Sequence, residues 1–200
     1  SQNNDPEQRL VADSYALERV VEIKNQPNYD GQVVVAQSVT MDAGAHVLSL
    51  ALAEAGKINL VTLQYNDFKE KTDDEPEIKE QGKLKSIETL ALAGVDVNTR
   101  GILVEKDWYF VVGNKVYTSP VQKPQLTELT TLPDDLGEPV AVAISAKETY
   151  LIVAMYDSHS SHENKGSFLL VDLTSKEVII HRNVMGKCVV AKGYDVNPWF

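Results

Sequence analysis

The residues that could do chemistry gather most densely in the segment 157–164, which reads Asp-Ser-His-Ser-Ser-His-Glu-Asn. His159 and His162 stand three residues apart, with Asp157 and Glu163 beside them. Imidazole and carboxylate groups bind divalent transition metals, but a catalytic metal needs at least three such ligands on a rigid frame. The serine content favours a solvated loop between two strands. We therefore expect a loop that offers Asp157, His159 and His162 to a ligand, and His159, His162 and Glu163 to a metal if one binds.

Aromatic side chains form a second candidate site. Trp108, Tyr109 and Phe110 are consecutive, so in a strand Tyr109 faces one side and the other two face the opposite side. Core burial of Trp108 and Phe110 is the favoured interpretation, and an exposed aromatic binding platform is the alternative. Trp108 and Tyr109 are accordingly kept as candidate binding residues. The aromatic pair Trp199 and Phe200 is expected to dock against a surface of this chain or of a partner.

The sequence carries none of the common enzyme signatures. It lacks a Gly-x-Ser-x-Gly elbow, a phosphate-binding Gly-x-x-x-x-Gly-Lys loop, a His-Glu-x-x-His helix and a Cys-x-x-Cys pair. Its one cysteine, Cys188, lies in an apolar run and is expected to be a buried thiol that forms no intramolecular disulfide. We predict no cofactor and favour a function other than catalysis, although triads can assemble from distant positions.

Composition excludes several classes of protein. The chain has 200 residues, of which 43% are hydrophobic and 24% charged, as is typical of globular domains. Its net charge of −10 opposes nucleic-acid binding, which depends on basic side chains that neutralise phosphates. No apolar run is long enough to span a bilayer, and the first residues lack the features of a signal peptide. We expect a soluble chain without a transmembrane segment.

From residue 32 onward the chain alternates short runs rich in Val, Ile, Leu, Tyr and Thr with clusters of turn-forming residues. The expected strands are 32–39, 46–53, 58–65, 83–91, 101–104, 108–112, 115–119, 126–132, 139–145, 150–156, 167–173, 177–182 and 188–191. No interval carries the long helical stripe that a parallel sheet needs for its crossovers. Antiparallel pairing of consecutive strands is therefore predicted.

Turn residues support this pairing. Gly113-Asn114 between two apolar runs predicts a tight hairpin, since positive φ costs glycine little. The segments 53–57 and 173–176 likewise break two runs with three to five turn-forming residues. The segment 67–82 is rich in Asp, Glu and Lys and is predicted to be a solvated, mobile insertion; a calcium loop is disfavoured because the required glycine and glutamate spacing is missing.

A four-strand unit recurs along the chain. The clearest copy runs from Pro139 to His181, and looser copies precede it, at a period of 40 to 50 residues once the charged insertion is removed. The turn and strand at 145–154, and the strand, turn and strand at 168–177, resemble those of β-propeller repeat proteins. This resemblance covers about residues 32–193 and implies an architecture but no activity. Closed propellers have about four to eight blades, so the chain would be a fragment, would close by oligomerising, or would form another fold.

We therefore predict a mainly β protein of antiparallel, propeller-like four-strand meanders, with a β-barrel or β-sandwich as the alternative. Residues 1–31 are expected to form a tail with a short helix that begins near Pro6, and a strand over 15–23 is the competing interpretation. Residues 32–200 are expected to form the β-meander domain, with the insertion 67–82.

Three functions remain open. The first is a non-enzymatic binding or scaffold module of the cell envelope or extracellular space, with a protein or glycan ligand, since the polar N-terminal tail resembles the mature start of a secreted or lipid-anchored bacterial protein. The second is a metal-assisted hydrolase or lyase that uses Asp157, His159 and His162. The third is a structural or assembly protein that pairs through strand edges and its C-terminal aromatics, by self-association or within a longer parent chain.

Overall fold

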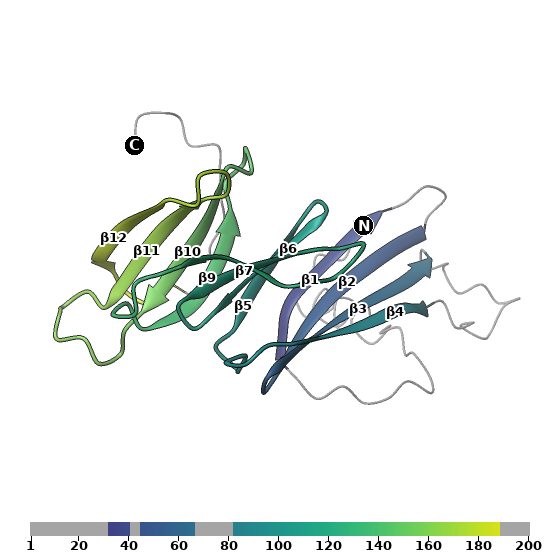
Figure 1. Ribbon diagram of the computed structural model, residues 1–200, viewed down its shortest axis with the longest axis horizontal. Helices are drawn as coiled ribbons and strands as arrows, with labels where there is room; N and C mark the ends of the chain where they lie inside the picture. The colour runs from purple at the N-terminus through teal and green to yellow at the C-terminus, as the bar shows by residue number, and fades with distance from the viewer. Residues whose placement is uncertain (1–31, 41–44, 67–81, 189–200) are drawn as a thin grey trace, which may run out of the picture.

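The protein folds into twelve strands in a computed structural model that describes residues 32–40, 45–66 and 82–188 (Figure 1). The strands are β1 (Gln32–Thr40), β2 (Ala45–Glu54), β3 (Lys57–Asn66), β4 (Gly82–Ala91), β5 (Arg100–Val104), β6 (Asp107–Val112), β7 (Lys115–Pro120), β8 (Thr127–Thr131), β9 (Glu138–Ile144), β10 (Tyr150–Tyr156), β11 (Gly166–Asp172) and β12 (Val178–Met185). The expected N-terminal helix, the charged residues 67–81 and the strand end 189–191 lie outside the described residues.

Consecutive strands pair in three four-stranded sheets: sheet A (β1–β4), sheet B (β5–β8) and sheet C (β9–β12). All pairs are antiparallel, and none of the three sheets closes into a barrel. Within the described ranges there is no helix. The prediction of a mainly β protein built from four-strand meanders is confirmed.

The predicted turns also form. Val112 pairs with Lys115 across a two-residue turn in which Gly113 has a φ of 58°. Glu54 pairs with Lys57 across a second such turn, and Gly56 has a φ of 76° there. Both turns place glycine where an L-residue would be strained, so the hairpins follow from local sequence.

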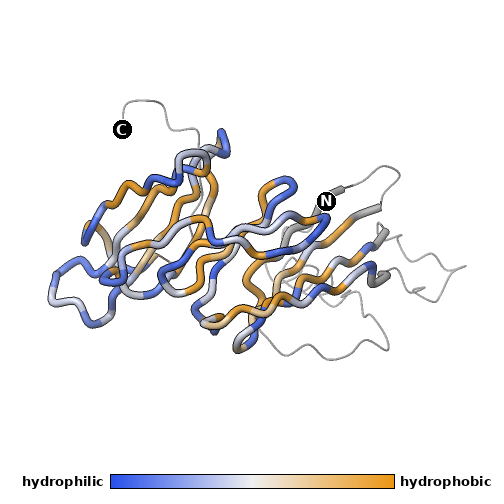
Figure 2. The backbone as a smooth tube through the Cα atoms, viewed as in Figure 1, coloured by the Kyte–Doolittle hydropathy of each residue, from blue (hydrophilic) through white to orange (hydrophobic). Residues whose placement is uncertain are grey.

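The three sheets are arranged side by side, with sheet B in the middle (Figure 1). Their first strands lie together, because β5 contacts both β1 and β9. Hydrophobic residues follow the strands and hydrophilic residues gather in the connections (Figure 2). This arrangement is compatible with a propeller-like or another all-β architecture.

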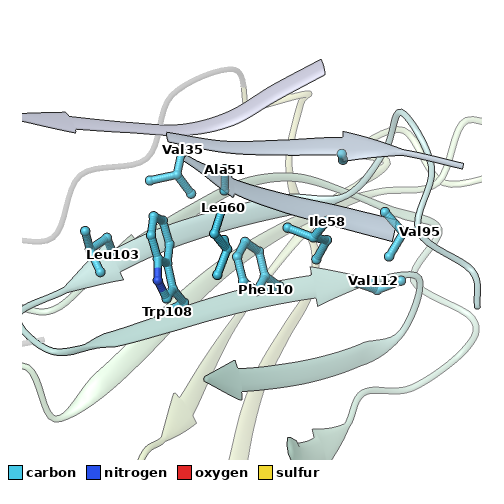
Figure 3. Packing of buried hydrophobic residues seen from close by; sticks show 10 residues of the cluster. Val35, Ala51, Ile58, Leu60, Val95, Leu103, Trp108, Phe110 and Val112 are labelled. Atoms are coloured by element: carbon cyan, nitrogen blue, oxygen red, sulfur yellow. The ribbon is translucent and has the colours of Figure 1, made fainter. Parts of the chain in front are cut away.

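Sheets A and B enclose the first of two hydrophobic clusters (Figure 3). Its buried members are Val35, Ala51, Ala53, Ile58, Leu60, Val95, Leu103, Trp108, Phe110 and Val112. The rings of Trp108 and Phe110 stack with their centroids 5.9 Å apart. Gly101 allows this packing, since a Cβ at that position would lie 2.7 Å from Phe110 Cδ1 and 3.0 Å from Val35 Cγ2.

Sheets B and C enclose the second cluster. Its buried members are Val111, Val116, Leu132, Leu136, Leu151, Val153, Met155, Leu169 and Val171. Tyr109 is half-buried and packs against this cluster, on the face of β6 opposite Trp108 and Phe110. Sheet B is therefore covered on both faces, and β6 contributes to both clusters.

The described part of the chain contains no helix that could cross a membrane.

Candidate polar binding site

A polar hollow of about 230 Å³ lies at the end of sheet C where β10 leads into β11. Three segments surround it: the connection 132–137 between β8 and β9, the loop 157–165 between β10 and β11, and strand β12. Its lining residues are Asp135, Leu136, Asp157, Ser160, Ser161, His162, Lys165, Ser167, Arg182 and Asn183. All of them except Leu136 are polar or charged, so the hollow suits a polar ligand.

A bulge in β12 brings its side chains to the hollow. Gly166 pairs with Met185, and Phe168 pairs with His181. The three residues 182–184 of β12 therefore lie opposite the single residue Ser167 of β11. Asn183 takes a φ of 51°, which asparagine tolerates better than most residues, and its N–H donates to Ser167 Oγ at 2.9 Å. Bulges redirect side chains at many binding sites.

Two glycines permit the close approach of these segments. A Cβ on Gly166 would meet the carbonyl oxygens of Gly186 and Met185, which belong to the chain just past the bulge. A Cβ on Gly137 would meet the Tyr156 carbonyl oxygen, at the end of β10. Both contacts involve backbone, which cannot move aside as a flexible side chain can. The walls of the hollow therefore depend on residues without side chains.

An ion pair joins two of these walls. Arg182 Nη1 donates to Asp135 Oδ1 at 2.9 Å and to Oδ2 at 2.8 Å. The hydrogen bond from Arg182 lowers the pKa of Asp135 below its ordinary value. Both side chains are solvent-exposed, so the pair contributes little to the free energy of unfolding, but it links β12 to the connection 132–137.

The loop 157–165 is held by its own hydrogen bonds. Asp157 Oδ1 accepts from the His159 N–H at 3.0 Å, and the Asp157 carbonyl accepts from the Ser160 N–H at 3.1 Å. The Asp157 N–H donates to the Lys165 carbonyl at 3.1 Å, which closes the loop at its base. The predicted loop between strands is present, and its first residue is also the acceptor that shapes it.

The predicted loop residues divide between two places. Asp157 and His162 line the hollow, whereas His159 and Glu163 are not among its lining residues; both histidines are exposed. Across the described ranges, no group of three or more His, Cys, Asp or Glu side chains is placed to hold a metal ion. The metal interpretation of His159, His162 and Glu163 would thus need a further ligand from another part of the protein.

The aromatic candidates lie elsewhere. Trp108 is only 2% exposed within the cluster between sheets A and B, where a ligand cannot reach it, so we remove it from the candidate binding residues. This placement agrees with the favoured interpretation of core burial. Tyr109 is half-buried between sheets B and C; burial chiefly raises the pKa of its hydroxyl, with a smaller contribution from Asp107. Neither side chain lines the polar hollow.

Sequence reasoning missed most of the hollow. The missed residues come from three separate parts of the sequence: Asp135, Ser167 and the neighbours Arg182 and Asn183. Pairing of β11 with β12 brings the last three together, and the connection 132–137 adds Asp135. One signal was available: the run Pro-Asp-Asp-Leu-Gly at 133–137 is a turn pattern between two strands, at the end of a repeat where loops converge.

The hollow can exchange hydrogen bonds of both kinds with a ligand. The carboxylates of Asp135 and Asp157 accept, the cationic groups of Lys165 and Arg182 donate, and serine hydroxyls do both. The two formal negative charges balance the two positive ones, so the lining does not select strongly for an ion of either sign.

Comparison with known proteins assigns no family. No protein-family model matches the chain, and no curated protein matches it. Among solved structures, the chain is similar to a crystal structure of an ACO/RPE65 chimera in its monoclinic form, at 10% sequence identity and a TM-score of 0.37. The alignment covers 70% of this chain and 35% of that one, so the chain spans about a third of that protein's length.

Proposed function

We propose that this protein is a non-enzymatic binding or scaffold module, and that the polar hollow of sheet C is its ligand-binding site. The observation that carries the proposal is the convergence of three chain segments on one polar hollow, with a bulge and an ion pair holding its walls. The cell envelope or extracellular space is kept as the proposed setting.

The rigid parts of the molecule support this proposal. The strands β10 and β11, which flank the loop 157–165, carry Met155 and Leu169, and both of these side chains are fully buried in the second cluster. A binding loop on a packed sheet keeps its shape without a ligand, and little ordering entropy is lost on binding. The loop 157–165 meets this condition because both of its ends continue into paired strands.

The size and chemistry of the hollow favour a sugar unit of a glycan as the ligand. Its volume of about 230 Å³ is below the 300 to 1,000 Å³ of sites for drug-sized molecules, so the hollow would take one small group of a larger ligand. Hydroxyls of a sugar both donate and accept hydrogen bonds. They can therefore donate to the carboxylates of the lining and exchange hydrogen bonds in both directions with its serines and Asn183.

Two histidines of one loop provide a matched test. The full chain, applied to a glycan array, should retain at least one glycan, whose affinity is then measured by calorimetry. His162→Ala removes a lining residue and should weaken binding about tenfold, the cost of one hydrogen bond to a ligand. His159→Ala changes a side chain of the same loop that does not line the hollow and should leave the affinity unchanged.

Equal losses in the two variants, or losses in neither, would place the ligand outside the hollow. If no glycan is retained while a protein partner is, and that partner responds to His162→Ala alone, the hollow stays the site and the ligand class changes from glycan to protein. If neither kind of ligand is retained at micromolar concentration, the binding function is wrong.

Metal-assisted hydrolysis ranks second. Asp157 and His162 do share the hollow, which is the observation in its favour. Elemental analysis of the purified protein tests it directly: stoichiometric zinc or manganese that is lost in the double variant His159→Ala/His162→Ala would favour the hydrolase or lyase. A metal-free protein that still binds its ligand would exclude it.

Assembly through strand edges ranks third. In the described sheets β4, β8 and β12 lie at outer edges, and β12 exposes Ile179 and Val184. However, the bulge at residues 182–184 interrupts the regular backbone of β12, and bulges of this kind discourage edge-to-edge pairing. The C-terminal aromatics lie outside the described residues. A strict monomer in sedimentation at high concentration would remove this function.

A further inference from the structure

The polar hollow contains a buried hydroxyl group that still has a proton to donate. Ser167 lines the hollow and is 2% exposed. Its Oγ accepts from the Asn183 N–H at 2.9 Å, but it donates to no acceptor within the part of the chain that the structure describes. Buried polar groups in native proteins nearly always have a partner, because an unmade hydrogen bond is costly. Since Ser167 faces the hollow, we expect the ligand to supply the acceptor.

A carboxylate oxygen of the lining has the complementary property. Asp157 Oδ1 accepts from the His159 N–H at 3.0 Å, whereas Asp157 Oδ2 accepts from no group in the described ranges. The second carboxylate of the lining differs, because both oxygens of Asp135 accept from Arg182 Nη1. A donor of the ligand is therefore directed to Asp157 rather than to Asp135.

Strand pairing brings these two groups close together. Ser167 pairs with Met155 of β10. The Asp157 N–H donates to the Lys165 carbonyl at 3.1 Å, so the pairing continues past the end of β10. Asp157 and Ser167 are thus diagonal neighbours on adjacent segments, a relation in which residues lie about 7 to 8 Å apart. Their side chains form no hydrogen bond with each other, and a small group placed between them can reach both.

Leu136 adds an apolar surface to this lining. It is the one lining residue with an apolar side chain, it is 4% exposed, and it belongs to the second hydrophobic cluster. A methyl group of a ligand can lie against such a residue without burying an unpaired polar atom. The hollow therefore suits a small neutral group that has an acceptor, a donor and an apolar end.

We propose that the polar hollow binds the acetamido group of an N-acetylated sugar, an inference that rests on the proposed glycan-binding function. A secondary amide is planar and directs its carbonyl and its N–H to opposite sides. The carbonyl accepts from the Ser167 hydroxyl, the N–H donates to Asp157 Oδ2, and the methyl group lies against Leu136. A single hydroxyl group is shorter and has no methyl group, so it makes fewer of these contacts.

Two disaccharides with the same backbone test the proposal. Diacetylchitobiose and cellobiose differ only in carrying an acetamido group or a hydroxyl group at the same position of each ring. In NMR titrations of the full chain, diacetylchitobiose should bind about tenfold more tightly than cellobiose, which is the difference expected from one additional satisfied hydrogen bond.

Three variants identify the groups that produce this preference. Ser167→Ala removes the donor, and Asp157→Asn keeps an oxygen for the His159 N–H but replaces the second oxygen with an amide nitrogen that cannot accept. Each should lower the affinity for diacetylchitobiose about tenfold and leave the affinity for cellobiose unchanged. Ser158→Ala is the matched control, because Ser158 is an exposed serine of the same loop that does not line the hollow, and it should change neither affinity.

Several results would overturn the proposal, and they differ from failure of the glycan-binding function. Equal affinities for the two disaccharides in the unchanged protein would exclude the acetamido group. Equal losses for both disaccharides in Ser167→Ala would show that Ser167 supports the bulge in β12 without contacting the ligand. If neither disaccharide binds while the array retains another glycan, the acetamido assignment is wrong and the glycan-binding function stands. A protein partner that is lost in Ser167→Ala but not in Ser158→Ala would assign the hollow to a peptide amide instead of a sugar.

Discussion

At the scale of single residues, the polar hollow depends on Gly137. Its φ of 81° is strained for any residue with a side chain, and a Cβ there would meet the backbone of Tyr156. We predict that Gly137→Ala lowers the free energy of unfolding by about 2 to 4 kcal/mol, the sum of a left-handed conformation and an overpacked contact. Gly186→Ala is the control, because no atom lies within 4 Å of its Cβ, and it should change stability by less than about 0.5 kcal/mol. Chemical denaturation measures both.

The ion pair of Arg182 with Asp135 gives a pH-dependent prediction. The pKa of Asp135 is lowered by Arg182, so the contribution of this carboxylate to stability is present above its ordinary pKa and is lost as the pH falls through the lowered value. Arg182→Gln should return the pKa of Asp135 toward its ordinary value, as measured by NMR titration of the carboxyl carbon.

Asp172 is an internal control for that titration. The backbone N–H groups of Ser175 and Thr174 lower its pKa, and Arg182 is not among the causes. Its titration should therefore be the same in the Arg182→Gln variant and in the unchanged protein. Parallel movement of both carboxyls would indicate a general disturbance of sheet C instead of a broken ion pair.

At the scale of elements, strands and hairpins were predictable, but the bulge in β12 was not. Alternating apolar residues and turn residues such as Gly113 are local signals, and the expected strands agree with the observed ones to within a few residues wherever the structure describes them. The bulge depends on the hydrogen bond between Asn183 and Ser167 and on the absence of a side chain at Gly166. These residues are brought together only by the pairing of β11 with β12. The site residues that were missed are those that this pairing supplies.

The bulge itself can be tested at Asn183. Asn183→Ala should lower the free energy of unfolding by about 1 kcal/mol, because alanine disfavours the φ of 51°. It should also weaken ligand binding, because the bulge positions Arg182 at the hollow. Asn183→Gly accepts the same backbone conformation and should retain stability, although it also lacks the side chain. Denaturation measures the difference, and equal stability of the two variants would contradict the role of backbone conformation.

At the scale of the whole molecule, sheet B joins the two hydrophobic clusters. Trp108 faces sheet A and Leu151 of sheet C packs against the opposite side of sheet B. The sequence predicted core burial of Trp108 and a strand over 150–156, but it could not show which sheets would enclose Trp108 and Leu151, because that depends on contacts among β1, β5 and β9.

The shared sheet predicts cooperative unfolding. Trp108→Ala should cost about 3 to 5 kcal/mol and Leu151→Ala about 2 to 5 kcal/mol, since each leaves a cavity in a buried cluster. Each variant should unfold in a single calorimetric transition, with a lower midpoint temperature than the unchanged protein. Val97→Ala is the exposed control and should leave that transition in place. A variant that splits the transition in two would show that the sheets unfold independently.

Gly101 decides how closely the first two sheets meet. The edge of the Phe110 ring and a methyl group of Val35 occupy the volume that a side chain at this position would take. Because β5 contacts β1 at this inner edge, a larger residue at position 101 would have to push Val35 of sheet A away from sheet B. The close approach of sheets A and B along their inner strands therefore depends on the absence of a side chain at one position of β5.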